Sequence, residues 1–413
     1  MRGMPRGALA VTIGLLAGAL VACGSTYQGT ALPGEIDIRK LDVGPYNTVP
    51  SNAHDDDYLP NFNNMGDVGA MRLIDYVASA YDIDPRLKYG WLTQAVSAGV
   101  PADELGTSDV AEAIGKKDKL LFGIKLTGGD KHTTFSSYDW GQKQDAAATT
   151  ITTVVNQFAD TDGAKQAGDD FYQAQLDRYQ GQNVPVALPK YPAAHAHWRP
   201  DQPYLWADLT YGSYLVTFYV STPKPDLAAL TALAEKSFDT QLPLLDQVKP
   251  VSDEEMLDLP WDPDHLITRT LNPDSKFNGP SFLAGGRKLL GQRGMLAYAE
   301  DRDFLKNRLA ALHADRYAVI DRSVVARTAD EQTAEKVVAD KNTLTRTSGE
   351  ATPPLNVPGA KCFQNSEDRS TLAYRFSCVV SYRRYVGFVS GQQLLDAQQR
   401  AAAQYALFAN SGD

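Results

Sequence analysis

The feature that most constrains the fold is a pattern that occurs twice in the chain. Residues 154–160 (VVNQFAD) precede a stretch of helical periodicity over 163–179, and residues 324–330 (VVARTAD) precede a similar stretch over 332–341. In each copy the β-branched run favours a strand, and the closing aspartate favours the start of a helix. The offset of 170 residues between the copies is typical of an internal duplication.

A second match has nearly the same offset. The aromatic segments 211–218 and 382–388 predict hairpin strands, and each precedes a predicted helix rich in alanine and leucine, over 226–245 and 391–408. The alternative is that common strand and helix patterns are alike here without a shared origin. Together with a third match upstream, these matches occur in the same order in both copies, which favours duplication.

A third match, between residues 70–76 and 294–298, has an offset near 224. The difference predicts an insertion in the first copy, near 88–150. A helix over 109–114 and a strand over 120–126 are predicted within the insertion, since the first has helical spacing and the second is an apolar run that glycines end.

The predicted fold class is α+β. Each of two related units is expected to form an antiparallel sheet with helices packed on one face. The N-terminal unit is predicted over 36–250, beginning with a strand over 36–43 and a helix over 71–80, and the C-terminal unit is predicted over 279–413. Prolines and acidic residues indicate a connector over 251–278.

The N-terminus has the pattern of an export signal that ends in a lipobox. Two arginines precede an apolar run over 8–19, which is too short for a spanning helix, and Leu-Val-Ala then precedes Cys23. We expect a signal peptide over 1–22, acylation of Cys23, and a tether over 23–35. The alternative is an ordinary signal with a cysteine near its cleavage site.

A lipid on Cys23 predicts a place on the extracytoplasmic face of the cell membrane. Two acyl chains give stable anchoring, whereas one chain binds a membrane only reversibly. The formal net charge of -10 argues against a nucleic-acid partner. We therefore expect the membrane as a partner through this lipid, and the sequence identifies no protein partner.

Cys362 and Cys378 are the two cysteines that remain. An even pair in an exported protein predicts a disulfide. The alternative is two buried free thiols.

Two short patterns resemble metal sites. His195 and His197 alternate, so a strand would place both imidazoles on one face, but no third ligand is near and the surrounding prolines indicate a surface segment. Asp160 and Asp162 resemble the start of a calcium loop that lacks its closing glutamate, so we favour a helix cap there. We expect no metal at either place.

Catalytic motifs are incomplete. Residues 279–281 (Gly-Pro-Ser) begin like the elbow of a serine hydrolase, but Leu283 occupies the position of the second glycine. Residues 285–288 (GGRK) lack the spacing of a phosphate-binding loop. The sequence therefore indicates no catalytic residue and no cofactor.

Aromatic residues gather in the two predicted hairpins, over 204–219 and 374–388. Most are expected in the core and in cross-strand pairs. The alternative is a groove for an apolar or sugar-bearing ligand of the cell envelope.

Five segments carry a family resemblance: GEID at 34–37, LDVGPY at 41–46, MRLIDYV at 71–77, DPRL at 84–87 and AQYAL at 403–407. They resemble uncharacterised lipoproteins of mycolic-acid-containing actinobacteria, of the mycobacterial and nocardial type, over nearly the whole mature chain. The resemblance implies a two-part, lipid-anchored envelope protein with a domain of unknown function. It brings no catalytic residues.

These observations predict a lipid-anchored extracytoplasmic protein of the cell envelope that binds a ligand or assists a partner without catalysis. The alternatives are an envelope hydrolase and a purely structural lipoprotein that binds a protein partner.

Overall fold

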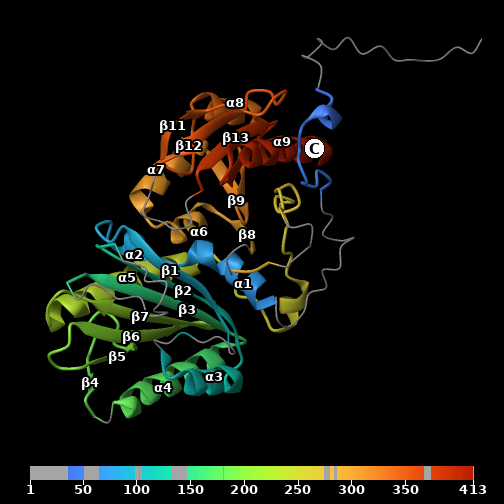
Figure 1. Cartoon of the computed structure of the whole chain (residues 1–413). Coiled ribbons are helices and arrows are strands. Elements are labelled where there is room, and N and C mark those ends of the chain that lie inside the picture. Colours follow the sequence, from blue (N-terminus) through green and yellow to red (C-terminus); the bar gives the residue numbers. More distant parts are fainter. Residues whose placement is uncertain are drawn as a thin grey trace, which may run out of the picture. The chain divides into compact units, whose positions relative to one another are not determined.

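Figure 1 shows a computed structural model of the chain. The structure describes residues 36–50, 65–97, 102, 105–132, 147–179, 181–273, 280–282, 286–366 and 374–412. The chain divides into residues 1–37 and a second unit, 38–413, to which every element below belongs. The predicted signal peptide over 1–22, Cys23 and the tether over 23–35 lie outside the described residues.

The first sheet has seven antiparallel strands in the order β1-β2-β3-β7-β6-β5-β4. The strands are β1 (Tyr89–Val96), β2 (Leu120–Gly129), β3 (Thr150–Phe158), β4 (Val184–Pro185), β5 (His195–Trp198), β6 (Tyr204–Tyr211) and β7 (Tyr214–Ser221). The strand predicted over 120–126 is confirmed as part of β2.

The second sheet also has seven antiparallel strands, in the order β11-β12-β13-β14-β10-β9-β8. The strands are β8 (Arg287–Leu290), β9 (Ala314–Ile320), β10 (Ser323–Thr328), β11 (Thr347–Ala351), β12 (Lys361–Asn365), β13 (Phe376–Tyr382) and β14 (Tyr385–Gly391). The predicted α+β class with two antiparallel sheets is confirmed.

Helices precede, follow and connect these strands (Figure 1). The α-helices are α1 (Met65–Leu73), α2 (Ala80–Ile83), α3 (Ser108–Lys117), α4 (Thr161–Arg178), α5 (Leu227–Leu245), α6 (Gln292–Ala297), α7 (Arg302–Leu312), α8 (Glu331–Ala339) and α9 (Leu394–Asn410). Short 3-10 helices within the described ranges are η1 (Ile38–Lys40), η2 (Ile74–Tyr76) and η4 (Glu254–Asp258). No helix within the described ranges is both long and apolar enough to cross a membrane.

The two sheets correspond strand for strand. Read from β8, the second sheet runs β8-β9-β10-β14-β13-β12-β11, which is the order of the first sheet with each number raised by seven. Helix α4 follows β3 as α8 follows β10, and α5 follows β7 as α9 follows β14. This shared topology supports the internal duplication that the two matches near an offset of 170 residues predict.

The third match is wrong. Residues 70–76 lie in α1 and η2, before β1, whereas residues 294–298 lie in and just after α6, behind β8. The segments that do correspond, 97–119 and 291–313, connect the first two strands of each sheet and have equal lengths. The extra residues of the first copy lie between β2 and β3, at 130–149, where the second copy has a tight turn.

Helices cover both faces of the first sheet, not one face as predicted. Leu215 of β7 lies against Gly168 of α4, where an added Cβ would stand 3.2 Å from the leucine Cδ1. Phe218 points to the other face and packs on Phe238 of α5, with ring centroids 5.0 Å apart. All nine residues of β3 are buried. A central strand of this kind needs cover on both sides.

The second sheet is covered in the same way. An added Cβ on Gly387 of β14 would stand 2.6 Å from Gln404 of α9. The next residue, Phe388, points to the opposite face and shares a hydrophobic cluster with Val337 of α8.

The start of the fold differs from prediction in two places. The strand predicted over 36–43 is wrong, since this stretch holds only the 3-10 helix η1. The helix predicted over 71–80 is divided into the end of α1, η2 and the start of α2. The division has a local cause, because Ser79 and Asp82 form a capping box that starts α2 as a new helix.

Cys362 and Cys378 form a disulfide. The two residues lie directly opposite each other on β12 and β13, and both are buried. The bond therefore links neighbouring strands within the second sheet.

The second half of the chain completes the edge of the first sheet. The backbone N–H of Gly90 in β1 donates to the carbonyl oxygen of Glu300 (3.1 Å), and the backbone N–H of Arg302 donates to the carbonyl oxygen of Lys88 (3.0 Å). The Arg302 side chain is fully buried, and an added Cβ on Gly128 of β2 would stand 2.6 Å from one of its amino groups. Burial lowers the pKa of Arg302 to about 10.

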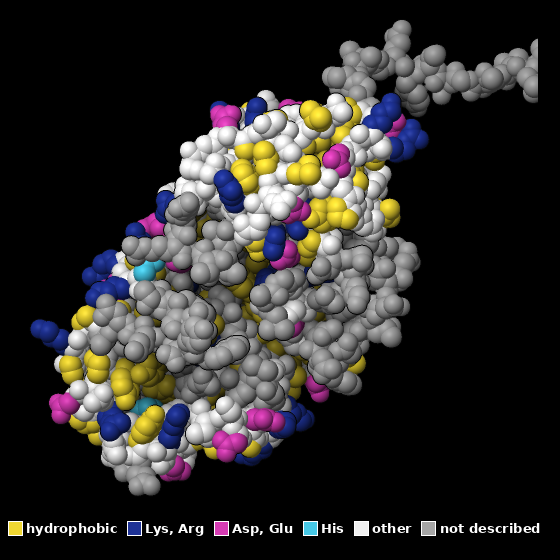
Figure 2. All heavy atoms as spheres, in the orientation of Figure 1, with side chains coloured by type: hydrophobic (Ala, Val, Ile, Leu, Met, Phe, Trp, Pro, Cys, Tyr) yellow, Lys and Arg dark blue, Asp and Glu magenta, His cyan; other side chains and the backbone are white. Residues whose placement is uncertain are grey.

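Charged side chains of both signs are interspersed over the described part of the face in Figure 2, with apolar side chains between them. This face shows no field of one sign among its described residues.

Candidate functional site: a cavity lined by both halves

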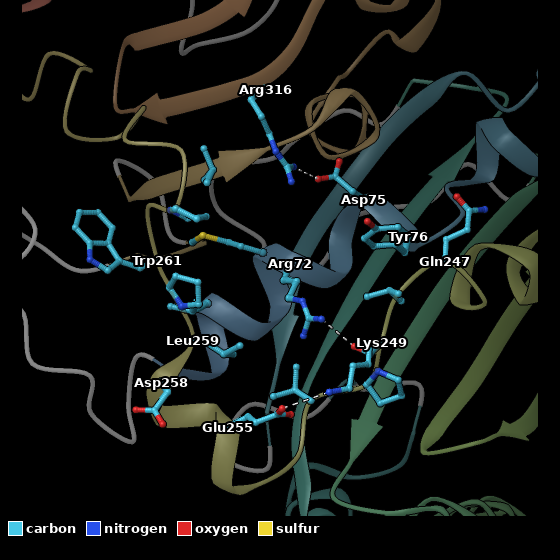
Figure 3. A pocket seen from close by; sticks show the side chains of 18 residues that line it. Arg72, Asp75, Tyr76, Gln247, Lys249, Glu255, Asp258, Leu259, Trp261 and Arg316 are labelled. Carbon is cyan, nitrogen blue, oxygen red and sulfur yellow. Dashed lines mark hydrogen bonds and ion pairs between the residues drawn. The ribbon is translucent and has the colours of Figure 1, made fainter. Parts of the chain in front are cut away.

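A cavity of about 550 Å³ lies among α1, η2, the chain that follows α5, and strands β8 and β9 (Figure 3). Its apolar wall includes Val68, Met71, Val248, Val251, Leu259 and Trp261. Its volume falls within the range of small-molecule sites. Charged side chains also line it: Arg72, Asp75, Lys249, Glu255, Asp258 and Arg316.

The local sequence explains how the wall forms. Val68 and Met71 are three residues apart on α1, so they share one face of the helix, and Arg72 lies beside them. The segment opposite contains Pro250, Pro260 and the short helix η4. Helix α5 ends at Leu245, and Pro250 and Pro260 then favour extended backbone at the residues before them, Lys249 and Leu259.

Arg72 is held in a defined orientation. Its Nη2 donates to the carbonyl oxygen of Lys249, at 3.0 Å (Figure 3). Within the part of the chain that the structure describes, no carboxylate lies within ion-pair distance of this guanidinium. Arg72 therefore contributes an uncompensated positive charge to the cavity.

The Lys249 side chain has a partner. Its Nζ lies 3.5 Å from a carboxylate oxygen of Glu255. The same carboxylate accepts a hydrogen bond from the backbone N–H of Ser252 (2.9 Å). That backbone bond, followed by the charge of Lys249, lowers the pKa of Glu255. Lys249 is thus compensated by a carboxylate that stays ionised.

Arg316 is also paired. It lies 3.3 Å from Asp75 and 3.3 Å from Asp264. Asp75 accepts hydrogen bonds from the backbone N–H groups of Gly291 and Gly294, both at 2.7 Å. These groups form the N-terminus of α6, so Asp75 acts as a cap supplied by a distant segment.

The cavity is suited to binding. The lining residues that the structure describes include no serine, threonine, cysteine or histidine. Among the described lining residues, an apolar wall meets the cation Arg72, which has no carboxylate partner, and the carboxylate of Asp258, which has no cationic partner. Such a lining can recognise a ligand by shape and charge.

The histidine pair predicted from the sequence lies elsewhere. Both side chains are on one face of β5, against Tyr172 of α4, with ring centroids 4.7 Å from His195 and 6.2 Å from His197. His195 lies between two carboxylates, Asp169 and Asp208, each 3.5 Å away. No group of three or more possible ligand side chains within the described ranges could hold a metal ion.

Burial sets the protonation of this group. Asp208 is 1% exposed, and burial raises its pKa to about 6, although its hydrogen bond and charge contact with His195 act against the shift. The same hydrogen bond raises the pKa of His195. His197 is 4% exposed and stacks on Trp206, with ring centroids 5.0 Å apart, and burial lowers its pKa to about 4. Sequence reasoning missed Asp169 and Asp208, which only the strand register and α4 bring to His195.

Asp160 caps a helix, as favoured from the sequence. Its carboxylate accepts a hydrogen bond from the backbone N–H of Gly163 (2.7 Å) at the start of α4. Asp330 does the same for Thr333 (2.8 Å) at the start of α8. The two copies thus keep the same cap.

Ser281 lies beside β8, where its backbone N–H donates to the carbonyl oxygen of Arg287 (3.1 Å). Its side chain forms a hydrogen bond with Asp67, whose pKa is raised to about 6 by burial. Lys288 is the cation near this carboxylate, and burial lowers the pKa of Lys288 to about 8. None of the three residues lines the cavity.

The aromatic hairpin over 204–219 does not form the cavity. Trp206, Tyr214 and Phe218 are buried, and Tyr204 stacks on Tyr219 with ring centroids 5.2 Å apart. The expectation that most of these residues are core and cross-strand pairs is confirmed for this hairpin.

Comparisons with known proteins identify the two parts of the chain. Residues 56–261 match the N-terminal part, and residues 266–411 the C-terminal part, of a family described as a domain of unknown function (DUF7373). No curated protein sequence matches the chain significantly. Among solved structures, the extracellular domain of PknH from Mycobacterium tuberculosis is similar, with 7% identity, 41% of this chain and 93% of that chain covered, and a TM-score of 0.27.

Proposed function

Because the chain belongs to the DUF7373 family, a domain of unknown function, we propose a function from the geometry of its own cavity. The protein is a lipid-anchored extracytoplasmic binding protein of the cell envelope, and it takes its ligand in the cavity beside α1.

The observation that carries this proposal is the cavity of about 550 Å³, with its apolar wall and one uncompensated arginine. Residues from both matched parts of the family line it, including Met71 of the first part and Arg316 of the second. An open cavity of this volume with an apolar wall would be filled by side chains if it served stability alone. A ligand site explains why it is kept open.

Location and anchoring are proposed from the sequence. The lipobox before Cys23 supports acylation, and two acyl chains would hold the protein at the membrane. The disulfide between Cys362 and Cys378 agrees with an oxidising, extracytoplasmic compartment.

Native mass spectrometry of the full protein, extracted gently from its own envelope, tests the binding function. A bound small molecule is expected in the wild type. Leu259→Trp fills the cavity and should remove it, whereas Leu257→Trp should not, since Leu257 is 40% exposed on the same segment and does not line the cavity. No bound molecule in the wild type, or equal loss from both variants, would refute the proposal.

Metabolic labelling with palmitate tests the anchor separately. Label should enter the wild-type protein and be lost in Cys23→Ala. Label retained in the variant would place the lipid elsewhere, and no label in either protein would contradict the anchor.

A further inference from the structure

We propose that the ligand of the cavity is an amphipathic anion, with its charged head group at Arg72 and its apolar part along the wall that Met71, Val251 and Trp261 help to form. This inference rests on the proposed binding function and adds the chemical class of the ligand.

The charges around the cavity favour an anionic ligand. Three cations line it, and two of them already have carboxylate partners: Lys249 has Glu255, and Arg316 has Asp75 and Asp264. Arg72 alone among the described cations of the lining has none. An anionic ligand would supply the missing charge.

The orientation of Arg72 also favours an anion. The carbonyl oxygen of Lys249 takes one of its five N–H donors (Figure 3). The remaining donors can bind a carboxylate or a phosphate in the bidentate geometry that a guanidinium favours. The nearest lining carboxylates do not compete, because Glu255 is held by Lys249 and Ser252, and the carboxylate of Asp258 points away from Arg72 in Figure 3.

The apolar wall favours a ligand with an apolar part. Val68 and Met71 precede Arg72 on α1 and line the same cavity. The chain after α5 adds Val248, Val251 and Trp261 to this apolar wall. An inorganic anion would leave this wall in contact with water. A ligand with an apolar part would cover it and gain free energy in proportion to the apolar area buried.

A binding titration separates the charge from the apolar contact. The protein is residues 23–413 with Cys23→Ser, which keeps it free of acyl chains and detergent. The probes are 11-(dansylamino)undecanoic acid and its uncharged methyl ester. The acid should bind more tightly than the ester, and Arg72→Gln should weaken the acid about tenfold or more without changing the ester.

Controls are built into the same titration. Arg178→Gln replaces an exposed arginine at the end of α4, outside the cavity, and should bind the acid like the wild type. Dodecyl phosphate should displace the acid, which extends the site to phosphate head groups, whereas inorganic phosphate should not, because it has no apolar part.

The outcomes distinguish the two proposals. Equal affinity of acid and ester, an unchanged affinity for the acid in Arg72→Gln, or displacement by inorganic phosphate would overturn the amphipathic anion and leave the cavity as a binding site. Binding of neither probe, or binding that Leu259→Trp does not reduce, would overturn the proposed site itself.

Discussion

His197 links the fold to pH, and substituting it gives a quantitative prediction. Its imidazole is 4% exposed, stacks on Trp206, and has no hydrogen-bond partner for either nitrogen among the described residues. His197→Phe keeps a flat ring in the same place and removes both nitrogens. At pH 7.5 we expect the variant to be as stable as the wild type to within about 1 kcal/mol, or more stable, because no hydrogen bond is lost.

The pH dependence follows from the lowered pKa. Burial lowers the pKa of His197 to about 4 from its ordinary value of 6.5, so between these values the unfolded chain binds more protons than the folded protein. The wild type therefore loses stability as the pH falls through this window. Between pH 7.5 and pH 4.5 the loss due to His197 is about 2.5 kcal/mol.

Asp208 acts in the opposite direction. Burial raises its pKa to about 6, so its proton is bound more tightly in the folded protein, and this contribution is lost as the pH rises through 6. The two effects partly cancel in the wild type. The difference between the wild type and His197→Phe removes the contribution of Asp208 and isolates that of His197.

The assay is urea denaturation followed by circular dichroism at pH 7.5 and pH 4.5. Relative to the wild type, the variant should gain about 2.5 kcal/mol in the free energy of unfolding on going to the lower pH. The control is His132→Phe. The side chain of His132 is 56% exposed, so this variant shows the effect on stability of replacing an exposed imidazole. A difference between wild type and variant that does not change with pH would refute a buried neutral His197.

Three further predictions concern stability. Gly128→Ala should destabilise the protein by about 1–3 kcal/mol, since its Cβ would stand 2.6 Å from Arg302 and 2.7 Å from a backbone oxygen, whereas Gly349→Ala, with nothing within 4 Å, should not; equal thermal midpoints would contradict this. Asp75→Ala should cost about 1–2 kcal/mol by removing the cap of α6, measured by urea denaturation, and an unchanged midpoint would show that the cap contributes nothing. Cys378→Ser should cost about 3 kcal/mol under non-reducing conditions, and the difference should vanish when the wild type is reduced.

Local patterns predict the elements of this fold better than their arrangement. Strands β3 and β10 follow from β-branched runs, and helices α4 and α8 follow from the capping aspartates Asp160 and Asp330. In each copy the run and its aspartate are close in the sequence. The order of seven strands and the cover on both faces depend on contacts between distant segments. The third match failed for a related reason, because short helices such as α1 and α6 look alike wherever they stand in the topology.

The candidate site was hidden from sequence reasoning. The segment 251–278 reads as a connector because of its prolines and acids, yet Leu259 and Trp261 within it form part of the cavity wall. In the sequence, nothing distinguishes Arg72 from the other arginines. Its importance comes from what surrounds it: a carbonyl oxygen at Lys249 that orients it and partners that neutralise the other cations.

The pairing of residues 299–302 with β1 has a consequence for how the two copies have diverged. An unpaired edge strand promotes association with other chains. Here the backbone of Glu300 and Arg302, from the second copy, pairs with the edge strand β1 of the first copy. The first copy in turn supplies Asp75 to α6. Each copy thus supplies a contact that the other lacks: cover for the edge strand in one direction and a helix cap in the other. If the gene is divided between the copies, each fragment should aggregate when it is produced alone, and both should be soluble when they are produced in the same cell.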